Sequence, residues 1–430
     1  MNWIKRHGFS VVRRVAVLFL AFVTGLLLGV LLLPPAPQLQ YVLDTIREIR
    51  IYATSFLRNT PKQHIRPRTH EGDGVVTAVP ERMAPGVTFM SGLFGNTLGF
   101  RLYAADGELL YEWPINFFTI APEEMKHKFH ALIHGAHLYE NGDIVANLDG
   151  RSLVRFDVCG RILWRSDRKS HHSIDIDDDG RIWTPTAGQE YVGVSSADTR
   201  FRFDGVAAFD PDTGAKLVDI DLVDSLLQSD MVGLVQTNYN RREDIMHLND
   251  ADVLDSELAP AFPMFEAGDI MLSSRNLFQL WVIDGDSHDL KWHFAGPLIG
   301  QHDADFRPDG TISVLDNRPK GDTLAFQGEN GAHEGSRILS IDPADDSTHV
   351  LYQSDEHNWF YTPFRGKHQI LRNGNILIVE TDVGRVFEVT PDGEVVWSFI
   401  NGWDDTRVGW VMGATRHPES YARIGETECD

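Results

Sequence analysis

From residue 86 onward, short runs of alternating apolar and polar residues are separated by turns rich in glycine and aspartate. Residues 301–318 are a clear example. An alternating run follows His302, a Pro-Asp-Gly turn ends at Gly310, and a second alternating run ends in Asp-Asn-Arg at Arg318. Because side chains alternate between the two faces of a strand, this pattern predicts paired β-strands. Residues 86–430 are therefore predicted to be all-β.

One type of hairpin recurs six times in this region. It consists of an apolar strand, an Asp-containing turn with glycine in most copies, and a second strand that often ends in tryptophan. The copies lie at residues 102–113, 154–164, 206–220, 280–292, 339–352 and 387–397. A spacing of roughly 45–75 residues is typical of four-stranded propeller blades with loop insertions. The repeat predicts a six-bladed β-propeller, with Trp113, Trp164, Trp292 and Trp397 packed between the blades.

A second type of hairpin begins with a histidine. His134, His172 and His302 each precede the turn glycine by eight residues. His247 is followed by an insertion before its glycine, and His368 precedes its glycine by six residues. An offset of two residues keeps a side chain on the same face of a strand, so all five histidines are predicted to share one end of the ring. If these strands are the innermost of their blades, the histidines line the mouth of a central channel.

The strand that returns from each of these turns ends near the same mouth. Arginines occur at the ends of four such strands, at Arg151, Arg275, Arg318 and Arg385. Histidines and arginines are therefore predicted to meet at one face of the propeller.

The N-terminal region has a different pattern. Residues 15–33 contain no charged residue and are long enough to cross a hydrocarbon core of about 30 Å. Basic residues precede this stretch, so we expect residues 1–14 in the cytoplasm and the propeller on the periplasmic or extracellular side. A cleaved signal peptide is the alternative. Residues 34–85 are predicted to form a helical stalk, from about Gln38 to Leu57, followed by a linker.

Composition excludes some functions. The chain of 430 residues has a formal net charge of −23, which argues against a nucleic-acid partner. Its two cysteines, Cys159 and Cys429, cannot form a disulfide framework, and two free thiols are expected rather than one bridge. Phosphate-binding glycine motifs are absent, so no nucleotide cofactor is expected. The oligomeric state stays open.

The histidines and arginines suggest two kinds of chemistry. Neutral imidazole is a common metal ligand, but the histidine spacing matches no recognised metal motif, and residues 175–180, DIDDDG, lack the last carboxylate of a calcium loop. No metal is therefore expected. Arginines bind the oxygens of a sulfate or phosphate group well, while one histidine can attack the central atom and another can protonate the leaving oxygen.

Four segments resemble the nucleotide-independent bacterial arylsulfotransferases. They are His171-His172-Ser173, MHLND with the later LSSRN, QHDADF with LDNR, and KHQILRNGNILIV, within roughly residues 126–401. The resemblance implies a six-bladed propeller without a cofactor. It also implies transfer of a sulfuryl group from an aryl sulfate to a phenol by a ping-pong route through a sulfated histidine.

The resemblance also implies roles for individual residues. His368 matches the nucleophile, His302 and His172 match residues that bind the sulfuryl oxygens or handle the phenol proton, and Arg318 matches the arginine that holds the sulfuryl group. Substrate binding is expected of His247, Arg275, His171 and His134. Aromatic residues are expected either to hold the aryl ring or to pack between blades, namely Phe117, Phe118, Trp359, Phe360 and Tyr361. Two alternatives stay open: a non-catalytic membrane-anchored scaffold, and a metal-dependent propeller hydrolase or lyase.

Overall fold

The computed structural model describes residues 17, 19, 20, 22–25, 37–120, 129–188, 190–192, 200–227, 229, 233, 244–319, 335–354 and 358–429. The chain divides into two units, residues 1–62 and residues 63–430. Most of the predicted membrane anchor, and all of residues 1–14, lie outside the described residues. Among the residues that are described, no helix is both long and apolar enough to cross a membrane.

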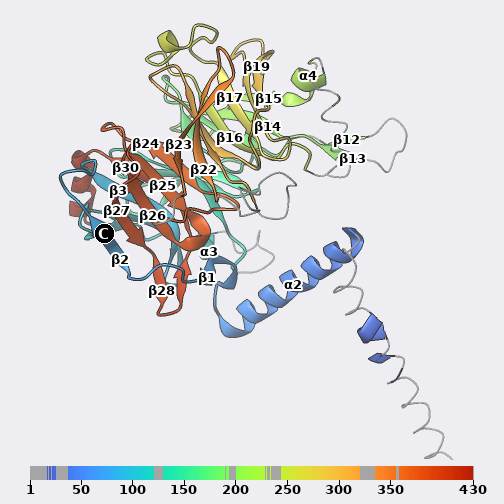
Figure 1. Cartoon of the computed structure of the whole chain (residues 1–430), viewed down its shortest axis with the longest axis vertical. Coiled ribbons are helices and arrows are strands. Elements are labelled where there is room, and N and C mark those ends of the chain that lie inside the picture. Colours follow the sequence, from blue (N-terminus) through green and yellow to red (C-terminus); the bar gives the residue numbers. More distant parts are fainter. Residues whose placement is uncertain are drawn as a thin grey trace, which may run out of the picture. The chain divides into compact units, whose positions relative to one another are not determined.

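The first unit contains helix α2, Pro37–Arg58, drawn in Figure 1. Proline at the first helical position has no N–H to leave unpaired, so it starts a helix well. The helix covers the stretch that apolar periodicity predicts, and Ile46 and Ile49 are exposed on its surface.

The second unit is built from antiparallel sheets that follow one another along the chain (Figure 1). Sheet 1 contains β30 (Val411–His417), β3 (Val87–Phe94), β4 (Thr97–Tyr103) and β5 (Leu109–Glu112). Sheet 2 contains β6 (Ile133–Leu138), β7 (Ile144–Leu148), β8 (Ser152–Phe156) and β9 (Ile162–Arg165). Sheet 3 contains β10 (Asp175–Ile176), β11 (Ile182–Thr186), β14 (Gly205–Phe209) and β15 (Lys216–Asp221).

Three further sheets complete the series. Sheet 4 contains β16 (Leu248–Val253), β17 (Ile270–Ser274), β18 (Gln279–Ile283) and β19 (Leu290–Phe294). Sheet 5 contains β20 (His302–Phe306), β21 (Ile312–Asp316), β22 (Arg337–Asp342) and β23 (Ser347–Gln353). Sheet 6 contains β24 (Lys367–Ile370), β25 (Ile376–Glu380), β26 (Arg385–Val389), β27 (Val395–Ile400) and β2 (Gly74–Ala78).

The remaining described elements are short. One small sheet joins β1 (Ile65–Pro67), β29 (Arg407–Gly409) and β28 (Gly402–Asp404), and another joins β12 (Glu190–Val192) and β13 (Arg200–Arg202). The short helices are η1 (Lys62–His64), α3 (Phe117–Ile120), α4 (Leu222–Leu227), η4 (Ala259–Ala261), η6 (Thr381–Val383) and η7 (Glu419–Glu426).

The series of sheets closes on itself. Strand β30 comes last in the chain but pairs with β3 in sheet 1. The first strands of successive sheets also contact one another, for example β16 with β20 and β30 with β6. A separate apolar core fills the space between each adjacent pair of sheets, including sheets 6 and 1. The described part of the chain is therefore an all-β, propeller-like fold with little helix.

The recurring tryptophans join neighbouring sheets, as predicted. All four are buried, and each indole N–H donates a hydrogen bond to a turn of the next sheet. Their acceptors are Gly142 O, Pro211 O, Asp346 Oδ1 and Ala105 O, for Trp113, Trp164, Trp292 and Trp397 respectively. A buried indole needs such a partner, and these turns supply it.

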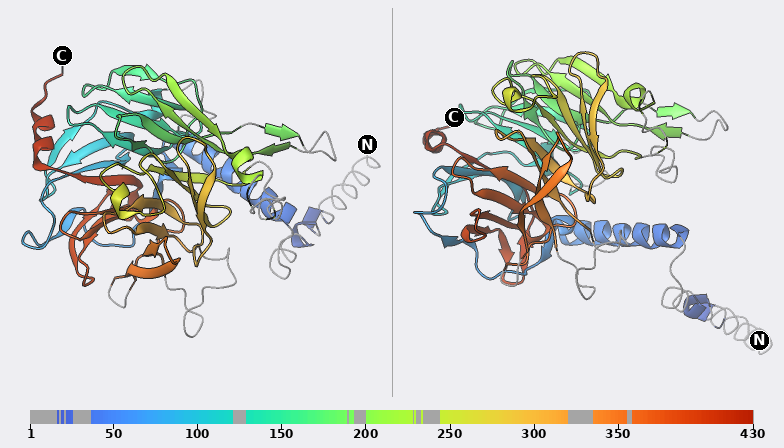
Figure 2. Two further views of the ribbon diagram at one scale, coloured as in Figure 1. Left: turned by 90° about the horizontal axis from the view of Figure 1, so that it is seen from above. Right: turned by 45° about the horizontal axis from the view of Figure 1, so that its top comes forward.

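Two expectations are wrong. The predicted linker before residue 86 contributes β1 and β2, because the β-branched residues of β2 add an edge strand to β27. The two cysteines are not free: Cys159 and Cys429 form a disulfide with their Cα atoms 5.5 Å apart. The bond fastens the C-terminal end, drawn in red in Figure 2, to the turn between β8 and β9. Nothing in the sequence indicates this bond, because the two cysteines are 270 residues apart and meet only when the ring of sheets closes.

Candidate functional site

The starts of the first strands converge on one small space, which we call the central gap. It has a volume of about 20 Å³ and takes lining residues from all six sheets. The lining residues are His134, His172, Ser173, Asn249, His302, Asp303, Arg365, Gly366, Lys367 and Met412. Residues that are far apart in sequence thus meet where the six sheets come together.

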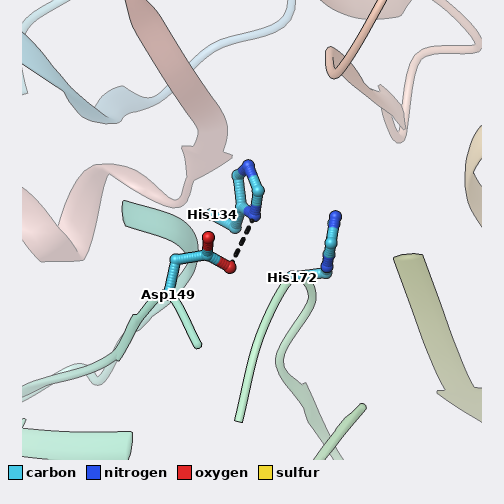
Figure 3. Close-up of side chains that lie close together, drawn as sticks. All are labelled: His134, Asp149 and His172. Atoms are coloured by element: carbon cyan, nitrogen blue, oxygen red, sulfur yellow. Dashed lines mark hydrogen bonds and ion pairs between the residues drawn. The ribbon is translucent and has the colours of Figure 1, made fainter. Parts of the chain in front are cut away.

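Four histidines, His134, His172, His247 and His302, form what we call the histidine cluster. The rings of His134 and His172 are stacked, with their centroids 4.3 Å apart (Figure 3). The ring centroids of His172 and His247 are 4.9 Å apart. His302 lines the central gap together with His134 and His172. His171 lies beside this cluster, with its Nδ1 atom 2.8 Å from Nδ1 of His172.

Carboxylates orient two of these rings. Asp149 Oδ1 lies 3.0 Å from Nδ1 of His134, and Asp244 Oδ2 lies 2.7 Å from Nδ1 of His247. The opposite nitrogens then face inward. Nε2 of His247 is 3.4 Å from Nη1 of Arg275, whereas Nε2 of His134 is buried and has no hydrogen-bond partner within the described part of the chain.

The tautomer of His302 follows from its partners. Its Nδ1 atom is 3.0 Å from Gly300 O and 2.7 Å from Asn317 Oδ1. The amide nitrogen of Asn317 already donates to two backbone carbonyls, so its oxygen faces the histidine. Both partners accept, hence Nδ1 bears the proton and the lone pair lies on Nε2. The nearest donor to Nε2 is the backbone N–H of Arg365, at 3.4 Å.

Cationic residues lie near His302. Burial and the charge of Arg275 hold the pKa of His302 well below its ordinary value of 6.5. Burial, together with neighbouring histidines, lowers the pKa of His172 in the same way. Arg365 and Lys367 line the central gap beside His302. At neutral pH His172 and His302 are therefore neutral imidazoles, with fixed positive charges nearby.

The backbone is strained where these residues lie. Left-handed φ angles occur at His172 (61°), His247 (48°), Asp303 (57°), Arg318 (52°) and Arg365 (64°). Such angles cost of order 1–3 kcal/mol each in residues with a Cβ and are concentrated at functional sites. The pairing register also shifts at the starts of β6, β16 and β20, and such bulges redirect side chains.

His368 lies in a different place. Its backbone N–H donates to Asp303, as the N–H of Ala304 donates to Asp250 and that of Ala251 to Ser173. His368 thus takes the place of Ala304, not that of His302. The predicted shared face is wrong for His368, because the left-handed Asp303 and the register shift beside it interrupt the alternation of side chains in β20.

The surroundings of His368 are acidic. Its Nδ1 atom is 2.9 Å from Asp303 Oδ2, and its Nε2 atom is 2.8 Å from Ser313 Oγ and 3.5 Å from Asp305 Oδ2. Burial lowers the pKa of His368, but the hydrogen bond to Asp303 and the charge of Asp305 outweigh it, so the pKa is raised. We call the acids beside it the carboxylate cluster: Asp175, Asp250, Asp252, Asp303 and Asp305. Asp250 and Asp303 are buried, whereas the side chain of Asp305 is 42% exposed.

Each cluster opens into its own cavity. The first cavity, of about 550 Å³, is lined by His171, His172 and His247 together with Asp149 and Arg202. The second cavity, of about 530 Å³, is lined by His368, Asp303, Asp305 and Lys367. Asp303 and Lys367 line both the second cavity and the central gap, so the two clusters are neighbours.

Arg318 lines neither cavity. It is buried, its backbone N–H donates to Ile299 O, and its charge acts on Asp316. Arg275, in contrast, contacts His247 and lies over the ring of Phe364 at 5.1 Å.

The aromatic residues divide between the two expectations. Phe117, Phe118 and Phe360 are buried in the cores between sheets, so they pack and do not meet solvent. Trp359 is 46% exposed, and its ring centroid is 6.3 Å from that of Tyr361. Phe364, which the sequence did not single out, is 38% exposed beside Arg275.

Two groups of side chains are close enough to hold a metal ion, although the sequence predicts none. They are His134, Asp149 and His172, and Asp303, Asp305 and His368. Sequence reasoning missed several residues of the site, including Asp149, Asp244, Asn317, Arg365 and Lys367. Asp303 and Lys367 directly follow or precede histidines that the repeat had identified, and this adjacency was the available signal.

A search of curated sequences found no match. Similar solved structures include a protein of unknown function from Bacteroides caccae, at 11% identity and a TM-score of 0.48, covering 77% of this chain and 98% of that one. They also include virginiamycin B lyase from Staphylococcus aureus, at 11% identity and a TM-score of 0.35, covering 62% and 69%. A third is the Dos1 propeller, at 10% identity and a TM-score of 0.40, covering 80% and 76%.

The fold and site define an all-β, propeller-like protein with histidines and arginines at the meeting point of its sheets. The arylsulfotransferase (ASST) family model matches residues 135–402. The chain therefore belongs to the arylsulfotransferase family, and the resemblance of its histidine segments to that family is confirmed. Membership supports an arylsulfotransferase-like function in general, with an aryl sulfate donor and a phenolic acceptor.

Proposed function

We propose that this protein is a nucleotide-independent arylsulfotransferase, with its six sheets as the six blades of a propeller. It moves a sulfuryl group from an aryl sulfate to a phenol by a ping-pong route through a sulfated histidine. The observation that supports it most is His302: a neutral imidazole with a fixed tautomer, on which the charge of Arg275 acts.

We favour His302 over His368 as the nucleophile. A nucleophilic imidazole needs a free lone pair, and the one hydrogen bond to Nε2 of His302 within the described residues is a long contact from a backbone N–H. Both nitrogens of His368 are engaged, and its raised pKa favours the protonated form. The acids beside His368 also repel an anionic sulfate ester.

Arginine and lysine would hold the sulfuryl oxygens. Arg275 offers a fork of donors beside His247 and acts electrostatically on His302, so it is placed better for this role than Arg318. Arg365 and Lys367 border the same gap. Such preorganised charges stabilise the negative charge that spreads over the sulfuryl oxygens and the leaving phenolate. Phe364 offers an exposed ring for the aryl group.

The reaction has two symmetric halves. In the first, Nε2 of His302 forms a bond to sulfur while the bond from sulfur to the aryl oxygen breaks, and the phenolate takes a proton from the site. In the second, the oxygen of the acceptor phenol forms a bond to sulfur, the nitrogen–sulfur bond breaks, and the phenol proton returns to the site. His171 lies where it can exchange that proton, because it lines the first cavity.

The test uses the full chain, a chromogenic aryl sulfate and a phenol acceptor. We expect His302→Ala to lower the rate of transfer by about 10³-fold or more, since it removes the group that forms the covalent intermediate. His368→Ala is expected to have a smaller effect. A quenched half-reaction without acceptor should leave the mass of one sulfuryl group on the peptide that contains His302.

The outcomes separate the alternatives. A sulfated His368 peptide, with His302→Ala still active, would assign the nucleophile to His368 as the family resemblance implies. A wild-type chain that transfers nothing and forms no sulfated histidine would leave the non-catalytic scaffold as the better explanation.

We also propose that residues 15–33 anchor the chain in a membrane, with the larger unit outside the cytoplasm. The apolar stretch and its basic flank support this orientation. The Cys159–Cys429 disulfide supports it too, since disulfides persist in oxidising compartments. Protease should digest residues 63–430 from the outside of intact cells or spheroplasts. Digestion only after lysis of the inner membrane would contradict the orientation.

A further inference from the structure

The first group that can hold a metal ion lies in the histidine cluster. His134, Asp149 and His172 each offer a ligand atom, and these three atoms lie within 4.8 Å of one another (Figure 3). His134 and Asp149 come from the two ends of the β6–β7 hairpin, and His172 comes from the start of sheet 3. Three ligands from two sheets thus meet at one point.

The spacing of these atoms fits a small ion. Ligands at about 2.0–2.2 Å from a tetrahedral ion lie about 3.3 Å from each other. Nδ1 of His134 and Oδ1 of Asp149 are 3.0 Å apart, and the imidazole rings of His134 and His172 have centroids 4.3 Å apart. The three ligand atoms lie within 4.8 Å of one another, so rotations of the side chains that close the longest of these distances would bring all three to bonding distance of one ion.

His134 and Asp149 are each other's hydrogen-bond partners, and His172 shares one nitrogen with His171. His134 keeps a buried Nε2 atom that has no hydrogen-bond partner in the described part of the chain. His247 differs, because Asp244 and Arg275 occupy both of its nitrogens. The second group that could hold a metal ion, around His368, differs too. Both nitrogens of His368 have hydrogen-bond partners, and Lys367 forms an ion pair with Asp303.

An ion at this point would also have an open coordination position. Asp149 and His172 line the first cavity, of about 550 Å³, so a fourth ligand can approach from there. Two imidazoles and one carboxylate with an open position are a donor set of catalytic zinc and of other divalent transition metals. The first cavity is also lined by the carboxylates of Asp167, Asp204 and Asp244.

We propose that His134, Asp149 and His172 form a binding site for a divalent transition metal of the zinc type. The open position of this metal takes the oxygen of the phenol. The second part rests on the proposed function: the ion would bind the phenolate that leaves the donor and would favour ionisation of the acceptor, as a Lewis acid. The first part, metal binding, does not depend on that function.

Binding is tested by equilibrium dialysis of the full chain against Zn²⁺, followed by metal analysis, and by the visible spectrum of the Co²⁺ form. We expect one Zn²⁺ per chain, and a loss of at least tenfold in affinity in Asp149→Asn, since removal of a ligand costs at least what loss of an outer partner costs. His134→Gln should behave alike. Asp149→Asn is isosteric and can still accept from His134, so the fold is expected to survive, and circular dichroism of the metal-free forms checks this.

The matched control is Asp167→Asn. Asp167 lines the same cavity and is exposed, so this variant makes the same change in charge without touching the three ligands. It should keep full Zn²⁺ binding. Equal binding by wild type, Asp149→Asn and Asp167→Asn would overturn the proposed site, as would the absence of stoichiometric Zn²⁺ in the wild type.

Sulfuryl transfer, measured on the same samples, keeps the two proposals distinguishable. A wild type that binds no metal but transfers sulfuryl groups would overturn the metal site and leave the proposed function intact. A wild type that binds one Zn²⁺ through Asp149 but transfers nothing would support the site and overturn the role in sulfuryl transfer.

Discussion

The histidine cluster and the carboxylate cluster lie next to each other along the first strands. Their surroundings nevertheless shift the pKa of His302 and of His368 in opposite directions. Burial and Arg275 lower the pKa of His302, so it is neutral at pH 7. The raised pKa of His368 results from Asp303 and Asp305, which outweigh its burial. The same side chain, in neighbouring copies of one repeat, is thus prepared for different chemistry.

The difference arises from a shift of a residue or two along the strand. In sheet 5 a left-handed Asp303 separates His302 from the regular part of β20, while in sheet 6 His368 lies within the regular part of β24. Position within the strand decides whether a histidine meets arginines or aspartates. Four predictions test this contrast, from the largest expected effect to the smallest.

Arg275→Ala should cause the largest loss. We expect kcat/KM for sulfuryl transfer to fall about 10²–10³-fold, as when one preorganised donor is removed from an anionic transition state. Arg275→Lys should recover part of the rate because it keeps the positive charge. Recovery should be incomplete because lysine lacks the paired N–H donors of the guanidinium group. Initial rates with a chromogenic aryl sulfate measure both. Arg318→Ala is the comparison. An equal loss of rate in this variant, with the fold intact, would assign the binding of the sulfuryl oxygens to Arg318.

Lys367→Met should destabilise the carboxylate cluster. Lys367 Nζ lies 2.5 Å from Asp303 Oδ1, and removal of one partner leaves a buried charge unpaired. Fully buried pairs lose about 3–5 kcal/mol in this way, and because a quarter of the lysine side chain is exposed we expect about 2–3 kcal/mol. Urea unfolding measures the change. A second variant, Lys367→Met with Asp303→Asn, should recover part of the loss; no recovery would mean that packing, and not charge, explains the effect.

Much of the fold was predictable from the sequence. Period-2 alternation, the repeated Asp and Gly turns and the recurring tryptophans predicted an all-β propeller-like fold, because these signals are local. The histidines were found for the same reason. The disulfide was not predictable, since Cys159 and Cys429 are 270 residues apart and meet only when the ring closes.

The details of the site were less predictable. The prediction that His368 shares a face with the other histidines required a regular strand in every copy of the repeat. Left-handed φ angles at Asp303 and Arg365 show that the strands are not regular there. Asp149 and Asn317 determine which nitrogen of His134 and His302 is free, but nothing in the repeat marks them as partners. Register and hydrogen-bond partners belong to tertiary structure, and single-sequence patterns do not encode them.

Asp175→Asn should stabilise the protein in a pH-dependent way. Burial and neighbouring acids raise the pKa of Asp175 from its ordinary 3.8 to about 7. A raised carboxyl pKa means that the folded state holds a proton that the unfolded state releases, so stability falls as pH rises from about 4 to 7. Asparagine has no such cost and can still accept the N–H of Val253. We expect a gain of about 1–2 kcal/mol at pH 8 and almost none at pH 4, from urea unfolding at each pH. A gain that does not change with pH would contradict the raised pKa.

The smallest expected effect is on the acid limb of the pH profile, whose position should distinguish the two histidines because their pKa values are shifted in opposite directions from 6.5. A nucleophilic imidazole loses its lone pair when it is protonated, so kcat/KM falls below the pKa of the free enzyme's histidine. With His302 as nucleophile the limb lies below pH 6.5, because burial and Arg275 lower that pKa. With His368 it lies above pH 6.5, because that pKa is raised. Profiles of wild type and His368→Gln should keep the limb at the same low pH; a limb above pH 6.5 in the wild type that moves in His368→Gln would assign the reaction to the carboxylate cluster.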